Sequence, residues 1–436
     1  MEFITYLQQA LKASLPKVIN AYEERVEANS LSEMEVEIRQ MCHELGGEIM
    51  VQCLEAQTPK YPEDHVPCPN CGGKARYVRR REGMSITVFG RIQYRRPYYG
   101  CENCHQGHYP LDEQLGIQPG QMSAEVLQLA AVMGIQTSFA TSQDLLARTA
   151  LLELSANSIR KACQQMGQQV MEAEEQGQAA SQDFDHQHQQ QRLAEKPRQI
   201  YGSMDGFKIH IDDEWHEMKA GSWWTTRRLA NGELKSENIA YYVDYLAATE
   251  FSDLVWTTGF QRFADQAHEL IFVADGAEWI WNIVQTHFPH AVQILDWYHA
   301  LSYVQAVAQA VFTDDATRNR WFEQQQQHLW QGQRSLVLRA CRQCAPVAPD
   351  VVNKALTFFA NQRSRMHYAR FRAAGYQIGS GTMESGCKQL GVGRLKIAGA
   401  QWLSNGAQLL AKARTAYLSG DWDQLNSSHS LLPQVA

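Results

Sequence analysis

The stretch Gln199-Ile-Tyr-Gly-Ser-Met-Asp-Gly-Phe-Lys-Ile-His-Ile211 decides the fold of the second half of this chain. Its apolar and aromatic residues predict a strand, because such side chains fit a partly buried pleated surface. Asp205 lies in the middle of that strand, with Gly202 and Gly206 close to it on either side. Glycines there would let a bulky ligand approach the backbone. The stretch therefore predicts a strand that presents a carboxylate to a ligand.

Further strand-like runs follow this one at residues 215–224, 238–248, 269–275 and 291–296. The first two come after short turns, as antiparallel strands do, whereas a helical pattern follows each of the last two. This order of elements is that of a ribonuclease-H-like α/β core. We predict such a core over residues 199–300 and 373–418, with a helical insertion at 301–372.

Three acidic residues in this region are candidate ligands of a divalent metal. Asp205 is the first, and Asp275 ends the buried strand-like run Phe-Val-Ala-Asp, where sites form in α/β sheets. Glu384 is the single acid among nine basic residues between positions 362 and 415. Carboxylates suit Mg²⁺, and two such ions can promote phosphoryl transfer. We predict two Mg²⁺ (or Mn²⁺) per site, with Glu278 as the competitor for the third ligand.

Three further basic residues are candidates for supporting roles at the metal site or for contacts with DNA: Lys388, Arg394 and Lys396. Lys388 follows the predicted glutamate ligand by four residues, on the same helical face. It could position a phosphate, as could the two later basic residues.

Two Cys-x-x-Cys pairs predict a zinc ribbon: Cys68, Cys71, Cys101 and Cys104. Four thiolates on two tight turns suit tetrahedral Zn²⁺, and one structural ion would hold a small domain that lacks a large core. Four unrelated buried cysteines are the alternative. Cys341 and Cys344 have no partner pair, and we expect them to be structural thiols on a helix.

Eight basic residues against one acid lie between positions 74 and 96, within the predicted ribbon. Such a run is often a solvated face, but basic side chains on strands can also neutralise phosphates. The predicted contacts to the DNA backbone are Arg79, Arg80, Arg81, Arg95 and Arg96. The basic run around the predicted glutamate ligand suggests a second DNA-contacting surface.

The chain is therefore predicted to be a multidomain α+β protein. Outside the core, the predicted segments are an N-terminal helical region (1–60), the zinc ribbon (61–115), a helix-turn-helix-like region (120–176), a linker (177–198) and a C-terminal tail (419–436). The segment 120–176 has the helix, turn and Ser155 or Asn157 cap of a DNA-binding motif. A helical hairpin that does not bind DNA would show the same sequence pattern.

Composition restricts the class of protein. The 436 residues carry a formal net charge of −7, which argues mildly against a nucleic-acid binder, although the distribution of charge matters more than its sum. The sequence contains no run of about 18 apolar residues, so no membrane span is predicted. The N-terminus does not have the pattern of a signal peptide. Paired cysteines indicate a reducing compartment. We expect a cytoplasmic, nucleoid-associated protein without membrane contact.

Together these motifs resemble the DDE transposases of bacterial insertion sequences, most closely the ISKra group, which is related to Mutator-like transposases. The resembling stretches are the cysteine ribbon of residues 68–104, SMDG, VADGAEWIW, LDWYHA and GSGTMESGCKQLGVGRLKIAGAQW. The resemblance implies binding to the terminal inverted repeats of a mobile element, followed by DNA strand cleavage and strand transfer. It also implies double-stranded DNA as partner and a homodimer or higher oligomer on that DNA.

The resemblance implies two further motifs. Asp296-Trp-Tyr-His299 matches an acid, two residues and a histidine that follow the second aspartate in relatives. The match implies that Asp296, at the end of a strand, and His299, at the start of a helix, face the site in a supporting role or contact DNA. The alternative is that Asp296 caps the helix while His299 packs in the core. Arg320-Trp321 could be the pair with which some relatives hold a flipped base, or Trp321 could be a core residue. Two other functions stay open: a non-catalytic DNA-binding regulator derived from a transposase, and a ribonuclease-H-like DNA nuclease.

Overall fold

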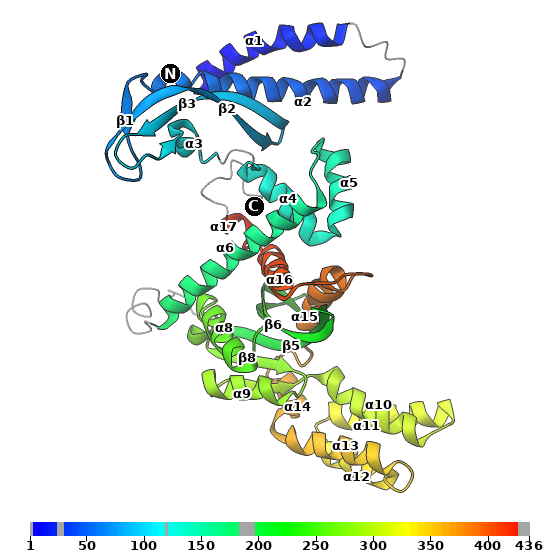
Figure 1. The fold of residues 1–436 in the computed structure, drawn as a ribbon. Coiled ribbons are helices and arrows are strands. Elements are labelled where there is room, and N and C mark those ends of the chain that lie inside the picture. Colours follow the sequence, from blue (N-terminus) through cyan, green and yellow to red (C-terminus); the bar gives the residue numbers. More distant parts are fainter. Residues whose placement is uncertain (1–2, 24–29, 118–120, 183–196, 426–436) are drawn as a thin grey trace. The chain divides into compact units, whose positions relative to one another are not determined.

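The computed structural model describes residues 3–23, 30–117, 121–182 and 197–425. It contains both helices and strands, as predicted, and forms two compact units, within residues 1–163 and 164–428 (Figure 1). The boundary between the units falls inside helix α6 (Ala156–Gln182).

The first unit begins with two helices, α1 (Phe3–Glu23) and α2 (Leu31–Glu55), where the sequence predicted a helical region. A four-stranded antiparallel sheet follows, in the order β1 (His65–Pro67), β2 (Lys74–Thr87), β3 (Gly90–Cys101) and β4 (Gly107–His108). Helix α2 and the short α3 (Pro110–Leu115) pack on the sheet. Their common core contains Leu54, Ile92, Tyr94 and Leu111, so one face of the β2–β3 hairpin is buried.

Three helices follow: α4 (Ala124–Gln136), α5 (Phe139–Ala150) and α6. Ser155 precedes α6 and accepts the backbone N–H of Ser158 at 3.1 Å, as predicted for a capping residue. Residues 151–155 separate α5 from α6, so the helix, turn and helix are present.

The predicted linker at 177–198 is wrong in its first part. Helix α6 continues to Gln182, because a run rich in Gln, Glu and Ala has good helix propensity however polar it is. Residues 183–196 of that predicted linker lie outside the described residues. In the predicted tail, Trp422–Leu425 form the short helix α17, and residues 426–436 are likewise not described.

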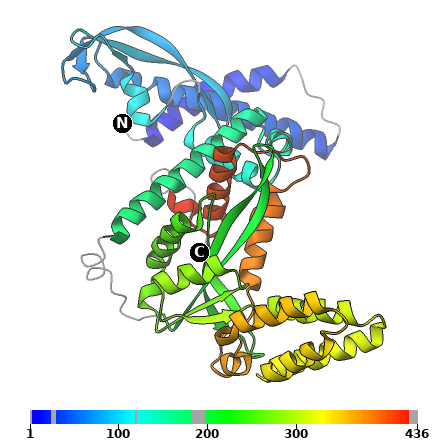
Figure 2. The same cartoon turned by 60° about the horizontal axis from the view of Figure 1, so that its bottom comes forward.

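The second unit contains a five-stranded sheet, whose green strands are visible in Figure 2. The order of its strands is β7-β6-β5-β8-β9. Its strands are β5 (Gln199–Ile211), β6 (Glu214–Arg228), β7 (Leu234–Asp244), β8 (Glu269–Ala274) and β9 (Val292–Leu295). The first three form an antiparallel meander, and β8 and β9 run parallel to β5. All five strands overlap the runs that the sequence predicted, although β7 begins and ends four residues before the predicted run at 238–248.

Both faces of this sheet are covered, which explains the nearly continuous apolar runs of β8 and β9. Ile200, Phe272 and Ala274 pack with helices α8 (Ala248–Gln261) and α9 (Glu278–His287). Tyr201 and Ile271 point to the opposite face, because successive side chains of a strand alternate. That second face packs with the helices that follow β9.

The stretch predicted as a helical insertion is helical, and its first helix begins slightly before residue 301. It comprises α10 (Trp297–Val311), α11 (Asp315–Trp330), α12 (Arg334–Cys344), α13 (Pro349–Asn361) and α14 (Tyr368–Ala373). Cys341 and Cys344 are buried in α12 within this core, as expected for structural thiols. Burial raises the pKa of both thiols.

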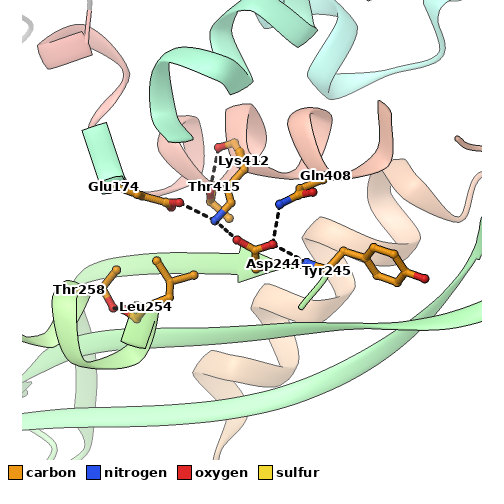
Figure 3. A network of polar contacts seen from close by, with 8 residues as sticks. All are labelled: Glu174, Asp244, Tyr245, Leu254, Thr258, Gln408, Lys412 and Thr415. Atoms are coloured by element: carbon orange, nitrogen blue, oxygen red, sulfur yellow. Dashed lines mark hydrogen bonds and ion pairs between the residues drawn. The ribbon is translucent and has the colours of Figure 1, made fainter. Parts of the chain in front are cut away.

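The chain then returns to the sheet through α15 (Gly381–Cys387), a π-helical segment η4 (Lys388–Leu395) and α16 (Ser404–Leu418). Helix α16 packs on β7 through a buried polar network (Figure 3). Lys412 is fully buried, and its Nζ contacts Glu174 Oε2 of α6 at 2.5 Å and Asp244 Oδ2 of β7 at 2.6 Å. Gln408 donates to the other oxygen of that aspartate. The network joins α6, β7 and α16.

Candidate acidic site and cysteine cluster

Three aspartates lie at the same level of three adjacent parallel strands. The last paired residues of β5 and β8 are Gly202 and Phe272, and Asp205 and Asp275 each lie three residues further along. The last pair of β8 and β9 is Ala274 with Leu295, and Asp275 and Asp296 each come next. Strands β8 and β9 end at this level, and β5 continues past it after its parallel pairing with β8 has ended. The carboxyl ends of parallel strands are where α/β sheets form their sites. Register alone therefore brings the three carboxylates together.

All three candidate metal ligands line one pocket of about 320 Å³. Its lining residues are Ser203, Met204, Asp205, Asp275, Asp296, Tyr298, His299, Ser302, Ser380, Met383 and Glu384. The competitor Glu278 is exposed at the start of α9 and is not among them. Among the described residues, the acids surround the pocket without all their carboxylate oxygens lying within 4.8 Å of one another.

Asp205 is half-buried on β5, and its Oδ1 accepts the backbone N–H of Gly206 at 2.7 Å. Burial raises the pKa of the Asp205 carboxyl, and the negative charges of Asp275 and Glu384 raise it further. The thiol of Cys387 donates a hydrogen bond to Asp205, which acts in the opposite direction. Negative charge thus accumulates in the pocket, and a bound cation would relieve it.

Asp275 follows β8 directly. Its Oδ1 accepts the backbone N–H of Ala277 at 2.9 Å, which fixes the carboxylate at the entrance to α9. The intervening Gly276 has a φ of 135°, a conformation that side chains rarely adopt. A Cβ there would also lie 2.6 Å from the ring of Phe358. The Asp-Gly pair is therefore needed to turn the chain here while the insertion packs against it.

Asp296 is the N-cap of α10 and is only 1% exposed. Its Oδ1 accepts the backbone N–H of His299 at 2.5 Å, and its Oδ2 accepts that of Ser380 at 2.6 Å. The capping alternative is therefore correct for Asp296, although the residue also lines the pocket. The ring of His299 is half-buried against Tyr303 and Phe358. His299 therefore fits both alternatives, since its ring packs on aromatic residues and also lines the pocket.

Glu384 is exposed on α15, and its backbone N–H donates to the Ser380 carbonyl at 3.0 Å. Ser380 is in turn held by Asp296, and the N–H of Trp297 donates to the Ile378 carbonyl at 2.9 Å. The loop before α15 is thus fastened to the start of α10. These contacts place the glutamate beside the two aspartates, although it follows them by more than a hundred residues.

The basic candidates near Glu384 separate into two groups. Lys388 and Lys396 are exposed. Arg394 is 1% exposed and packs near the ring of Trp402, so the prediction that it contacts DNA is wrong. Arg365, Lys412 and Arg414 of the same basic run are also buried. The run looked like a solvated surface because sequence alone does not separate cations that are buried within the core from those on its surface.

The four ribbon cysteines form the one cluster of metal-ligand type among the described residues, with all sulfurs within 4.8 Å of one another. Cys68 Sγ lies 3.7 Å from Cys104 Sγ, and Cys71 Sγ lies 3.6 Å from Cys101 Sγ. Tetrahedral zinc with bonds of about 2.3 Å requires sulfurs about 3.8 Å apart. The cluster could therefore bind a structural metal such as zinc.

Both cysteine pairs adopt the same turn. The residue after each pair, Gly72 or His105, has positive φ (69° and 57°) and donates its N–H to the carbonyl of the first cysteine. The N–H of that cysteine donates to a carbonyl five residues ahead, at 2.7 Å for Cys68 and 2.9 Å for Cys101. Two equivalent turns thus present two thiols each to one point.

The five ribbon arginines do not share one environment. Arg79, Arg80 and Arg95 are exposed, as the prediction of phosphate contacts requires. Arg81 is half-buried, with its guanidinium 3.7 Å from the centre of the Tyr98 ring. Arg96 is 3% exposed and pairs with the buried Asp112, so its predicted contact with the DNA backbone is wrong. Strand alternation directs it to the face that α2 and α3 cover.

The two residues of the Arg320-Trp321 motif also differ in their environment. Arg320 is exposed, while Trp321 is half-buried against the core of the insertion and contacts Phe312 at 5.7 Å between ring centres. The core interpretation therefore holds for Trp321. The sequence argument did not single out six of the residues that line the pocket: Ser203, Met204, Tyr298, Ser302, Ser380 and Met383. Three of them, Met204, Tyr298 and Met383, each adjoin a predicted site residue in the sequence, which was the available signal.

Within the described residues, none of the helices combines the length and apolar character that crossing a membrane requires. No curated protein matches the chain. The model of an uncharacterised protein family, UPF0236, matches residues 25–340. That segment contains the cysteine cluster and the three aspartates, and it ends before Glu384. Because the match covers well over half of the sequence, the chain belongs to the uncharacterised protein family UPF0236.

Proposed function

We propose that this chain is a DDE transposase that binds the ends of a mobile element and catalyses DNA strand cleavage and strand transfer. One observation carries the proposal: Asp205, Asp275 and Glu384 line a single pocket at the carboxyl edge of the sheet. The strand order β7-β6-β5-β8-β9, with a meander followed by two parallel strands, supports a ribonuclease-H-like core. Helices α10 to α14, which lie between Asp275 and Glu384 in the sequence, are then an insertion in that core.

The donor set suits Mg²⁺ or Mn²⁺. Carboxylates are the ligands that such hard cations prefer, and burial plus two negative neighbours already raises the pKa of Asp205. Asp205, Asp275 and Glu384 would hold the metal, which when bound supplies Lewis acidity at the scissile phosphate. Asp296 would keep α15 in place, and the exposed Lys388 and Lys396 would offer positive charge to DNA.

The cysteine cluster is proposed to hold a structural zinc ion, and the exposed arginines of the hairpin are proposed to bind DNA outside the catalytic pocket. Arg79, Arg80 and Arg95 would contact phosphates, which adds affinity that falls with salt concentration. The α5–α6 pair would add a helix-turn-helix contact. A protein that binds two element ends would act as a homodimer or higher oligomer in the nucleoid.

The test is incubation of the full chain with Mg²⁺ and a supercoiled plasmid carrying the natural DNA that flanks this reading frame. Joined products are expected. Cleavage without joining would instead indicate a nuclease, and binding without cleavage a regulator. Asp275→Asn and Glu384→Gln should abolish both reactions. Glu278→Gln is the matched control, because Glu278 is an exposed acid three residues after Asp275. Loss of activity in Glu278→Gln with retention in Glu384→Gln would reject the triad.

A further inference from the structure

The rim of the acidic pocket carries an aromatic ring with an unusual exposure. Tyr298 lines the pocket together with the acids, and it is 65% exposed. Its neighbours in α10 behave differently: Trp297 is 6% exposed and packs on Trp330 and Tyr368, and His299 packs on Tyr303 and Phe358. Within the part of the chain that the structure describes, no aromatic ring stacks on Tyr298. A large apolar face is thus left uncovered beside the pocket.

The backbone that carries this ring is firmly held. Asp296, two residues earlier, accepts the N–H groups of His299 and Ser380, and Trp297 donates to the Ile378 carbonyl. The ring edge lies against Gly379, where an added Cβ would be 3.3 Å from Tyr298 Cε2. A ring on a fixed backbone loses little conformational entropy when a ligand covers it.

A nucleobase fits these features. Every base has a π face, so stacking on an exposed ring is tolerant of sequence, and it is a neutral contact that the acids of the pocket do not repel. We infer that Tyr298 is a stacking platform for the base next to the phosphate that enters the acidic pocket. This inference rests on the proposed function, because it takes DNA as the molecule that occupies the pocket.

Tyr298→Ala and Tyr298→Phe separate stacking from the hydroxyl group. On a duplex carrying the natural flanking sequence, Tyr298→Ala should lower kcat/KM for Mg²⁺-dependent cleavage by roughly 5- to 100-fold, as expected for the loss of one base–aromatic stack. Tyr298→Phe should stay near wild type. Trp215→Ala is the matched control, because Trp215 is 64% exposed in the same unit and does not line the pocket.

An abasic nucleotide beside the cleaved phosphate makes the test specific. The abasic nucleotide should lower the kcat/KM of the wild type by about the factor that Tyr298→Ala loses on the intact duplex. It should not lower the kcat/KM of Tyr298→Ala any further. Equal abasic penalties in both proteins, or wild-type cleavage by Tyr298→Ala, would overturn the inference. If the variant does not fold, an abasic duplex that wild type cleaves normally would overturn it as well. Undiminished cleavage by Asp275→Asn would instead overturn the proposed function.

Discussion

The carboxylate of Asp296 accepts the backbone N–H of Ser380 at 2.6 Å, across a sequence separation of 84 residues. The same carboxylate caps α10 through the N–H of His299. One buried side chain therefore joins the end of β9, the first turn of the insertion and the loop that carries Glu384. The pocket depends in part on this junction, because the loop before α15 helps to place the glutamate beside the aspartates, together with the packing of α15 on β5 and β6.

Asp296→Asn should lower both stability and Mg²⁺-dependent cleavage. An amide keeps one acceptor oxygen but turns a donor toward the second N–H, leaving a buried group without a partner at a cost of about 1–3 kcal/mol. Urea unfolding measures the first effect and cleavage the second. Asp314→Asn is the control, since Asp314 caps α11 by accepting the N–H of Thr317 at an exposed site. Equal effects of the two substitutions would contradict the junction role.

Zinc analysis of the purified chain should give one ion per molecule. Cys101→Ser should release the zinc and destabilise the β2–β3 hairpin, because the two cysteine turns would no longer be joined by the ion. Atomic absorption together with limited proteolysis reads out both effects. Cys341→Ser, in the buried core of the insertion, should retain the zinc. A full complement of zinc in Cys101→Ser would refute the cluster as a metal site.

Neighbouring arginines of the hairpin should have opposite phenotypes. Arg96→Ala leaves the buried Asp112 without its cation, and loss of one partner of a buried pair costs about 3–5 kcal/mol. Burial already raises the pKa of Asp112, and Arg96 is one of the groups that oppose this. Arg95→Ala should leave thermal unfolding unchanged and weaken binding to a DNA duplex, with a smaller dependence on salt. Reversed phenotypes would show that the faces of the hairpin are assigned wrongly.

Lys412→Met should destabilise the second unit strongly. Without the ammonium group, Glu174 and Asp244 face each other across a buried site, and a cost of about 3–5 kcal/mol is expected. Burial raises the pKa of Glu174, which Lys412 counteracts. Chemical denaturation measures the loss. Adding Glu174→Gln and Asp244→Asn to Lys412→Met should restore much of the stability, and no recovery would point to packing instead of charge.

The sequence by itself determined the elements whose causes are local. The spacing of the two Cys-x-x-Cys pairs specified both turns, because each turn closes within six residues of its first cysteine. The five strands of the second sheet followed from continuous or alternating apolar runs. The end of α6 was missed, because polarity marks a break only where the residues are also poor helix formers.

The tertiary structure decided what depends on distant residues. Strand register placed Asp205, Asp275 and Asp296 at one level, and the contact of Asp296 with Ser380 added Glu384. Burial separated Arg96, Arg394 and Lys412 from the cations on the surface, and it left Tyr298 exposed at the pocket. The physical reason is the same in each case. A side chain's environment depends on which elements cover it, and chain segments far apart in sequence supply that cover.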